Sequence, residues 1–99
     1  MSGSNQLILT GRVVELEPLR YTPAGVAIVR FKLAHESEQT EAGAIRQLNM
    51  EIACVATEKM ARLVCAAPLG TAVRVEGFIA HRGKNHRGIE LHALNIHFE

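Results

Sequence analysis

Residues 81–88, which read His-Arg-Gly-Lys-Asn-His-Arg-Gly, form the most cationic segment of this 99-residue chain. The segment holds three cations, Arg82, Lys84 and Arg87, and it contains no acidic residue. Lysine and arginine side chains neutralise phosphates and release counterions, which gives salt-dependent affinity for nucleic acid. The alternative interpretation is an ordinary solvated hairpin tip.

Other candidate side chains lie nearer the amino terminus. Arg30 and Lys32 alternate with apolar residues, so they share the outward face of an extended segment. Arg20, Tyr21 and Arg46 lie near the loop ends of the same predicted sheet, and Tyr21 could stack on a base. The alternatives are ordinary outward charges and a tyrosine ring packed on the rim. The candidate nucleic-acid-binding residues are therefore Arg20, Tyr21, Arg30, Lys32, Arg46, Arg82, Lys84 and Arg87.

Aromatic residues are scarce, with no tryptophan, one tyrosine and three phenylalanines. Each base stacked on an aromatic ring contributes about 1–3 kcal/mol. Phe31 belongs to an inward pattern, Phe78 falls on an outward face, and Phe98 lies near the end of the chain. We therefore expect weak binding to single strands, mainly through charge.

The sequence offers little for metal binding or catalysis. Cys54 and Cys65 lie eleven positions apart inside apolar runs, without a Cys-x-x-Cys motif. His92 and His97 are five apart on a predicted strand, so they face opposite sides. All ten acidic residues are glutamates, which leaves no aspartate for a triad. We expect no cofactor, no metal and no enzymatic activity, and two buried, reduced thiols.

Length and composition predict one domain over residues 1–99, with residues 1–5 disordered. The formal net charge is +1, so any electrostatic footprint must be local. No apolar run approaches the roughly 18 residues of a membrane span, and the first residues lack the features of a secretory signal. We therefore expect a cytoplasmic protein.

Hydrophobic periodicity predicts five strands and one short helix. Val29, Phe31, Leu33 and His35 show a period of two on one face. We expect a bend or bulge at Gly11, a loop or hairpin tip at residues 36–43, and a loop at residues 81–88. The five strands are expected at residues 7–17, 26–35, 45–55, 71–80 and 89–98.

The helix is expected between the third and fourth strands. Thr57 can cap it, and Met60, Leu63 and Val64 fall at helical spacing. Pro68 and a following glycine end it. This element order predicts an all-β OB-fold, a five-stranded Greek-key barrel whose last loop commonly borders a nucleic-acid groove.

Arg20-Tyr21-Thr22-Pro23-Ala24-Gly25, followed by Phe31-Lys32-Leu33-Ala34, resembles a signature of bacterial single-stranded DNA-binding proteins. Within that superfamily the chain is similar to the primosomal replication protein N (PriB) family over nearly its whole length. The matching residues are Leu7, Leu9 and Gly11; Pro18, Leu19 and Arg20; Pro23 and Gly25; Glu41, Ala42, Gly43, Arg46 and Gln47; Val75, Gly77, Phe78 and Ile79; and Leu91, His92 and Ala93.

The resemblance implies a homodimer of OB-folds that binds single-stranded DNA and takes part in replication restart. It implies a nucleoid-associated protein that bridges DNA and the restart helicase, primosomal protein N-prime, together with other primosome proteins and no membrane. Where better-known members carry Phe, Trp and Arg, this chain has Ala44, Asn49 and Glu36. We therefore expect weaker DNA binding and greater reliance on the helicase.

Two further hypotheses compete with a DNA-binding accessory protein. One is an OB-fold adaptor whose basic loop meets an acidic protein surface with little DNA binding. The other is a replicative single-stranded DNA-binding protein without its tail. Such proteins carry a long Gly/Pro/Gln-rich tail, and this sequence ends at His97-Phe98-Glu99, which favours the PriB family.

Overall fold

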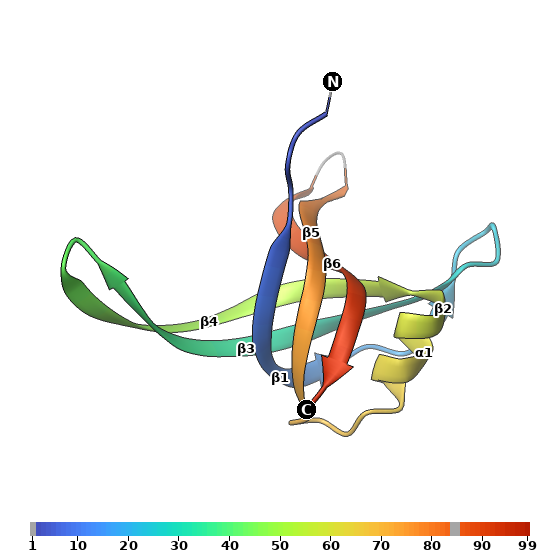
Figure 1. Ribbon diagram of the computed structural model, residues 1–99. Helices are drawn as coiled ribbons and strands as arrows, with labels where there is room; N and C mark the ends of the chain where they lie inside the picture. Colours follow the sequence, from blue (N-terminus) through green and yellow to red (C-terminus); the bar gives the residue numbers. More distant parts are fainter. Residues whose placement is uncertain (1, 84–85) are drawn as a thin grey trace.

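The alternating apolar residues place most of this chain in β-strands. A computed structural model describes residues 2–83 and 86–99 (Figure 1). Lys84 and Asn85, in the segment expected to be a loop, lie outside the described residues. The elements are β1 (Leu7–Leu16), β2 (Arg20–Tyr21), β3 (Ala27–Glu41), β4 (Ala44–Thr57), α1 (Glu58–Cys65), β5 (Ala72–Gly83) and β6 (His86–Phe98).

Five long strands close into a barrel, as the sequence predicted. Their order is β1-β5-β6-β4-β3, and β1 also pairs with β3. All pairings are antiparallel except β4 with β6, which is parallel. The two-residue β2 adds to the edge of β3. The helix lies between β4 and β5, so the expected OB-fold order is confirmed.

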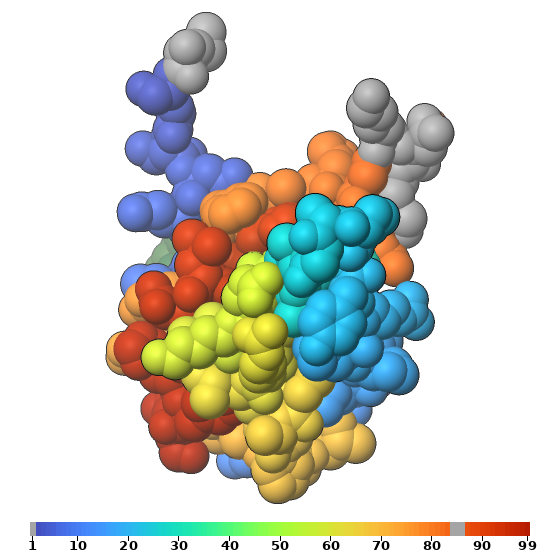
Figure 2. All heavy atoms as spheres, turned by 90° about the vertical axis from the view of Figure 1, so that its right-hand side faces the viewer, coloured from blue at the N-terminus to red at the C-terminus, as the bar shows by residue number. Residues whose placement is uncertain are grey.

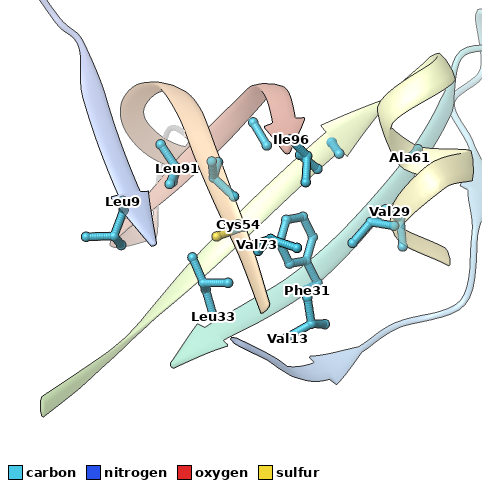
Figure 3. Packing of buried hydrophobic residues seen from close by; sticks show 14 residues of the cluster. Leu9, Val13, Val29, Phe31, Leu33, Cys54, Ala61, Val73, Leu91 and Ile96 are labelled. Atoms are coloured by element: carbon cyan, nitrogen blue, oxygen red, sulfur yellow. The ribbon is translucent and has the colours of Figure 1, made fainter. Parts of the chain in front are cut away.

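The barrel interior holds the apolar face of each strand (Figure 3). The expected inward set on β3, Val29, Phe31, Leu33 and His35, is buried. The His35 ring reaches two partners, with Nδ1 2.7 Å from the Thr10 carbonyl oxygen and Nε2 2.8 Å from the Ser37 hydroxyl. This polar residue thus enters the core with both ring nitrogens satisfied.

The loop or hairpin tip expected at residues 36–43 is a hairpin, but its turn is shorter than expected, because β3 continues to Glu41 and β4 starts at Ala44. We name the projecting part of this hairpin, residues 36–51, the β3–β4 arm; it extends to one side of the barrel in Figure 1. Ala42 and Gly43 have φ angles of 51° and 78°. Positive φ at both central residues is typical of a type I′ turn, which matches the twist of the flanking strands.

The segment expected to be a loop at residues 81–88 is also extended where it is described. β5 runs to Gly83 and β6 starts at His86. Because the strands pair up to the Gly83–His86 register, Arg82 and Arg87 lie on the strands of a β5–β6 hairpin. Before β1, the Asn5 side chain bonds both backbone groups of Ile79, at 2.7 and 3.0 Å.

Helix α1 starts at the expected place without the expected cap. Thr57 occupies the N-cap position with extended backbone, but its side chain makes no capping hydrogen bond. Glu58 has a φ of 52°, and its carboxylate accepts a hydrogen bond from the Ala27 N–H at 3.3 Å. Ala61 and Val64 form the buried face, while Leu63 is exposed, contrary to the predicted stripe.

The expected bulge at Gly11 is found three residues later. The β1–β3 register shifts between Val13 and Glu15, which leaves Val14 as the extra residue. Gly11 instead permits close approach, because an added Cβ would lie 2.4 Å from the Ala34 carbonyl oxygen. Here β1 passes from one partner strand to the next.

Gly77 gives the sharpest test of this packing. An added Cβ would lie 1.7 Å from the His92 carbonyl oxygen, so β5 and β6 would have to separate. We expect Gly77→Ala to lower the free energy of unfolding by about 3 kcal/mol, measured by urea denaturation. Gly83→Ala on the same strand is the control, since nothing lies within 4 Å of its added Cβ. Equal stability of both variants would contradict the packing.

Candidate nucleic-acid interface

A hollow of about 590 Å³ lies on the barrel between β1, β3, β4, β5 and β6. We name it the charged hollow. It gathers three of the predicted cations, Arg30 and Lys32 from β3 and Arg82 from β5. Carboxylates line it as well, and the six charged residues are Glu15, Glu17, Arg30, Lys32, Arg82 and Glu90.

Arg30 is held by a buried carboxylate. Its Nε lies 3.4 Å from the Oε2 atom of Glu90, whose side chain is only 3% exposed, whereas the Arg30 side chain is 30% exposed. Arg30 and Val55 are register partners on β3 and β4, and Val55 in turn pairs with His92 on β6. The guanidinium therefore reaches across β4 to a carboxylate that is itself nearly out of solvent.

Lys32 lies between two carboxylates. Its Nζ is 2.9 Å from Glu15 on β1 and 3.8 Å from Glu51 on β4. Lys32 and Glu15 are direct cross-strand partners in the register, the arrangement in which opposite charges stabilise a sheet. The hydrogen bond and the charge of Glu15, with a smaller contribution from Glu51, raise the pKa of Lys32.

The described arginines of the β5–β6 hairpin differ from Arg30 and Lys32 in their exposure and ion pairing. Arg82 and Arg87 are exposed, and neither forms an ion pair with another described residue. Lys84, predicted alongside them, lies outside the described residues. Arg82 also lines the charged hollow. These two arginines are thus available to an incoming anion.

Arg20 and Tyr21 lie on β2, beside the amino-terminal part of β3. The Arg20 guanidinium is 3.7 Å from the Glu17 carboxylate, and both side chains are largely exposed. Tyr21 is 63% exposed, so its ring is free to stack rather than packed on the rim. Figures 1 and 2 show the segment that joins β1 to β3 beside α1, and Figure 1 shows the arm on the opposite side of the barrel.

The structure does not bring Arg46 to the other cations. It lies on the β3–β4 arm, where its guanidinium donates to the Glu41 carboxylate at 2.8 Å. Ala44 and Asn49, the positions without the family's rings, are exposed on the same arm. The arm therefore presents neither an unpaired arginine nor an aromatic ring at these positions.

Two features of the interface escaped the sequence analysis. Glu90 was not singled out, because its burial depends on neighbours from other strands. Phe78, predicted to face outward, stacks on His92 with ring centroids 4.6 Å apart and planes 6° apart. The ring is half-buried, so it is less available for stacking on a base than an outward position suggests.

No group of three metal-ligating side chains gathers among the side chains that the structure describes. Among the same residues, no helix has the length and apolar character needed to cross a membrane. Cys54 is buried and Cys65 half-buried, and both are free thiols. The charged groups of the hollow are thus the main chemical feature of this surface.

Comparison with known proteins identifies relatives in sequence and in fold. Over residues 5–95 the chain matches the family described as "another single-strand binding protein family". It is 41% identical over 88 residues to the replication restart protein PriB of Bordetella pertussis, covering 89% of this chain and 82% of that protein. The structure of PriB from Ralstonia solanacearum superposes with a TM-score of 0.89 at 32% identity, covering 98% and 99% of the two chains.

A more distant structure shares the fold alone. A deletion mutant of the single-stranded DNA binding protein from Thermus aquaticus has a TM-score of 0.79 at 24% identity. The match covers 98% of this chain and 51% of that chain.

Cys54 gives the pH test of this region. Burial, with a smaller contribution from the Glu90 charge, raises the pKa of the Cys54 thiol from 9.0 to about 12. The stability contributed by the neutral thiol is therefore complete below pH 9 and is lost as the pH rises toward 12. We expect the unfolding free energy of the protein, relative to Cys54→Ala, to fall across that range in urea denaturation. Cys65→Ala is the control, and a constant difference would refute the burial argument.

Proposed function

This chain belongs to the single-strand binding protein family and, within it, to the PriB replication restart proteins, and on that premise we propose that it binds single-stranded DNA during replication restart. It acts by binding and is not an enzyme. We place it in the cytoplasm with the nucleoid, where its DNA lies.

The exposed arginines of the β5–β6 hairpin carry this proposal. Arg82 and Arg87 are solvated and unpaired among the described residues, so they can neutralise phosphates without giving up a carboxylate. Arg82 belongs to this hairpin and also lines the charged hollow, where Arg30 and Lys32 lie. Tyr21, exposed on β2, supplies a ring for one base. We propose that the strand crosses the barrel from the hairpin over the hollow toward β2.

We further propose that the protein bridges single-stranded DNA and the restart helicase, with other primosome proteins as partners. The support is its membership of the PriB family. Bridging requires two surfaces, because a residue that holds phosphate cannot also hold a protein. The β3–β4 arm, which reaches away from the β5–β6 hairpin (Figure 1), provides a surface apart from the DNA path.

A protein-interaction adaptor with little DNA binding is the second candidate. The observation that favours it is the pairing of Arg20, Arg30, Lys32 and Arg46 with carboxylates. Each must release a carboxylate before it holds a phosphate, which weakens binding. Exposed ion pairs contribute little, about 0–1 kcal/mol, so exchange is feasible for three of the four.

We also propose that the protein is a homodimer joined through β1. The amino-terminal part of β1 pairs with β5 along one edge, while β3 joins only from Arg12 onward. Ile8 on this part is 64% exposed and shares a hollow of about 410 Å³ with Phe78 and Leu94. An exposed strand edge with apolar side chains favours pairing with a second copy around a twofold axis.

The DNA proposal is tested by fluorescence polarisation with a labelled strand of about 30 nucleotides across a salt series. We expect affinity to fall with salt, and Arg82→Ala/Lys84→Ala/Arg87→Ala to reduce the steepness of that dependence by about 2, from roughly 0.7 per lost phosphate contact. The charge-matched control is Lys59→Ala/Arg62→Ala/Arg74→Ala, whose residues lie on α1 and β5 outside the charged hollow.

Equal losses in both triple variants would show that total charge, not the hairpin, binds the strand. If no binding appears at low salt, the adaptor becomes the better candidate. The same variants would then be tested for capture of the restart helicase. Bridging requires that the wild-type protein hold the helicase and the labelled strand together in one complex.

The dimer is tested by light scattering on a sizing column. We expect Ile8→Glu to give a monomer, because the new charge would be buried against the second copy. Leu69→Glu is the control: it is also 64% exposed, but it lies after α1, away from β1's free edge. A dimeric Ile8→Glu variant would place the interface elsewhere.

A further inference from the structure

The carboxylate of Glu90 lies in the charged hollow beside the arginine that the proposed DNA strand would meet. We propose that Glu90 sets the affinity of this protein for single-stranded DNA, by occupying Arg30 and repelling phosphate from the hollow. This inference rests on the proposed DNA binding and deepens it, because it names the residue that limits the strength of that binding.

Charge balance is the first argument. The charged hollow contains three cations and three carboxylates, so the charges of its lining cancel. A phosphate is drawn to a surface by an excess of positive potential, and this lining supplies none. The hollow has the size of a small-ligand site but lacks the charge of a phosphate site.

The position of Glu90 is the second argument. Glu90 lies on β6, and its register partners on the two adjacent strands are Ala53 on β4 and Ala80 on β5. Both partners have small side chains, which leave space over the sheet. The Glu90 carboxylate nevertheless stays 3% exposed, with Arg30 Nε at 3.4 Å and His92 Nε2 at 4.0 Å. A charge so far out of solvent is weakly screened, so its repulsion of a nearby phosphate is strong.

The contrast with the other acids is the third argument. Glu15 and Glu17 are about half exposed or more, so water and salt screen them and their side chains can swing away. Glu90 is fixed in β6 and cannot leave. Arg82, at the edge of the same hollow, has no carboxylate partner among the described residues and remains open to phosphate.

The substitution Glu90→Gln tests the proposal, because it removes the charge and keeps the shape and an acceptor oxygen for Arg30. We expect the dissociation constant for a labelled oligothymidine of about 30 nucleotides to fall about tenfold at low salt. Glu76→Gln is the matched control: Glu76 is half-buried and near Arg74 and His97, but it lies outside the charged hollow. Equal tightening in both variants would overturn the proposal.

The double variant Arg30→Met/Glu90→Met keeps the proposal testable should Glu90→Gln fail to fold, because replacing both partners of a buried ion pair with apolar side chains of similar volume is often neutral for stability. We expect this variant to bind the labelled strand at least as tightly as the wild type, because it removes the repulsion together with an arginine that Glu90 already occupies. Weaker binding than the wild type would overturn the proposal.

A readout without DNA separates this inference from the proposed function. Inorganic pyrophosphate is titrated into the full-length protein, and the Arg30 Nε–H resonance is followed by NMR, with its assignment taken from Arg30→Lys. We expect the resonance to shift in Glu90→Gln and not in the wild type. That result with no DNA binding in either protein would overturn the DNA proposal alone, whereas a resonance that responds equally in both would overturn the role of Glu90.

Discussion

The barrel closes because β1 changes its partner strand partway along its length. Its first residues pair with β5, and from Arg12 onward it pairs with β3. The change needs a glycine where the Ala34 carbonyl approaches and an extra residue at Val14. Once β1 has left β5, Glu15 comes opposite Lys32, and this pairing builds one wall of the charged hollow. The strand that closes the barrel, β1, therefore also supplies Glu15 to the charged hollow.

Barrel closure also leaves the distal parts of β3 and β4 without β1 as a partner. β3 pairs with β1 only as far as Ala34, so beyond that point β3 and β4 have each other as partners. The two strands continue as the β3–β4 arm, with cross-strand bonds from Arg46 to Glu41 and from Gln47 to Glu38. Strand pairing and the turn stabilise the arm, because it projects beyond the apolar core.

Periodicity in the sequence was sufficient for the barrel and insufficient for the arm. Val29, Phe31 and Leu33 alternate because one face of their strand is buried, so their strand and its direction could be predicted. Residues 36–41 are polar on both faces because neither face meets a core, and they therefore resemble a loop. The burial of Glu90 was equally hidden, because it depends on Arg30, which is sixty positions away in the chain and is brought near by the β3–β4 and β4–β6 pairings together.

The charges of the β3–β4 arm oppose the binding of a nucleic acid along it. The register places Glu36, Glu38 and Glu51 on one face of the β3–β4 arm, opposite Asn49, Gln47 and Ala34. Three carboxylates along one face of a ribbon repel a phosphate backbone, and Ala44 offers no ring at the turn. Arg46, on the other face, already holds Glu41. On the proposed DNA path, the unpaired cations therefore lie at the β5–β6 hairpin, and the charged hollow beside them adds no excess positive charge.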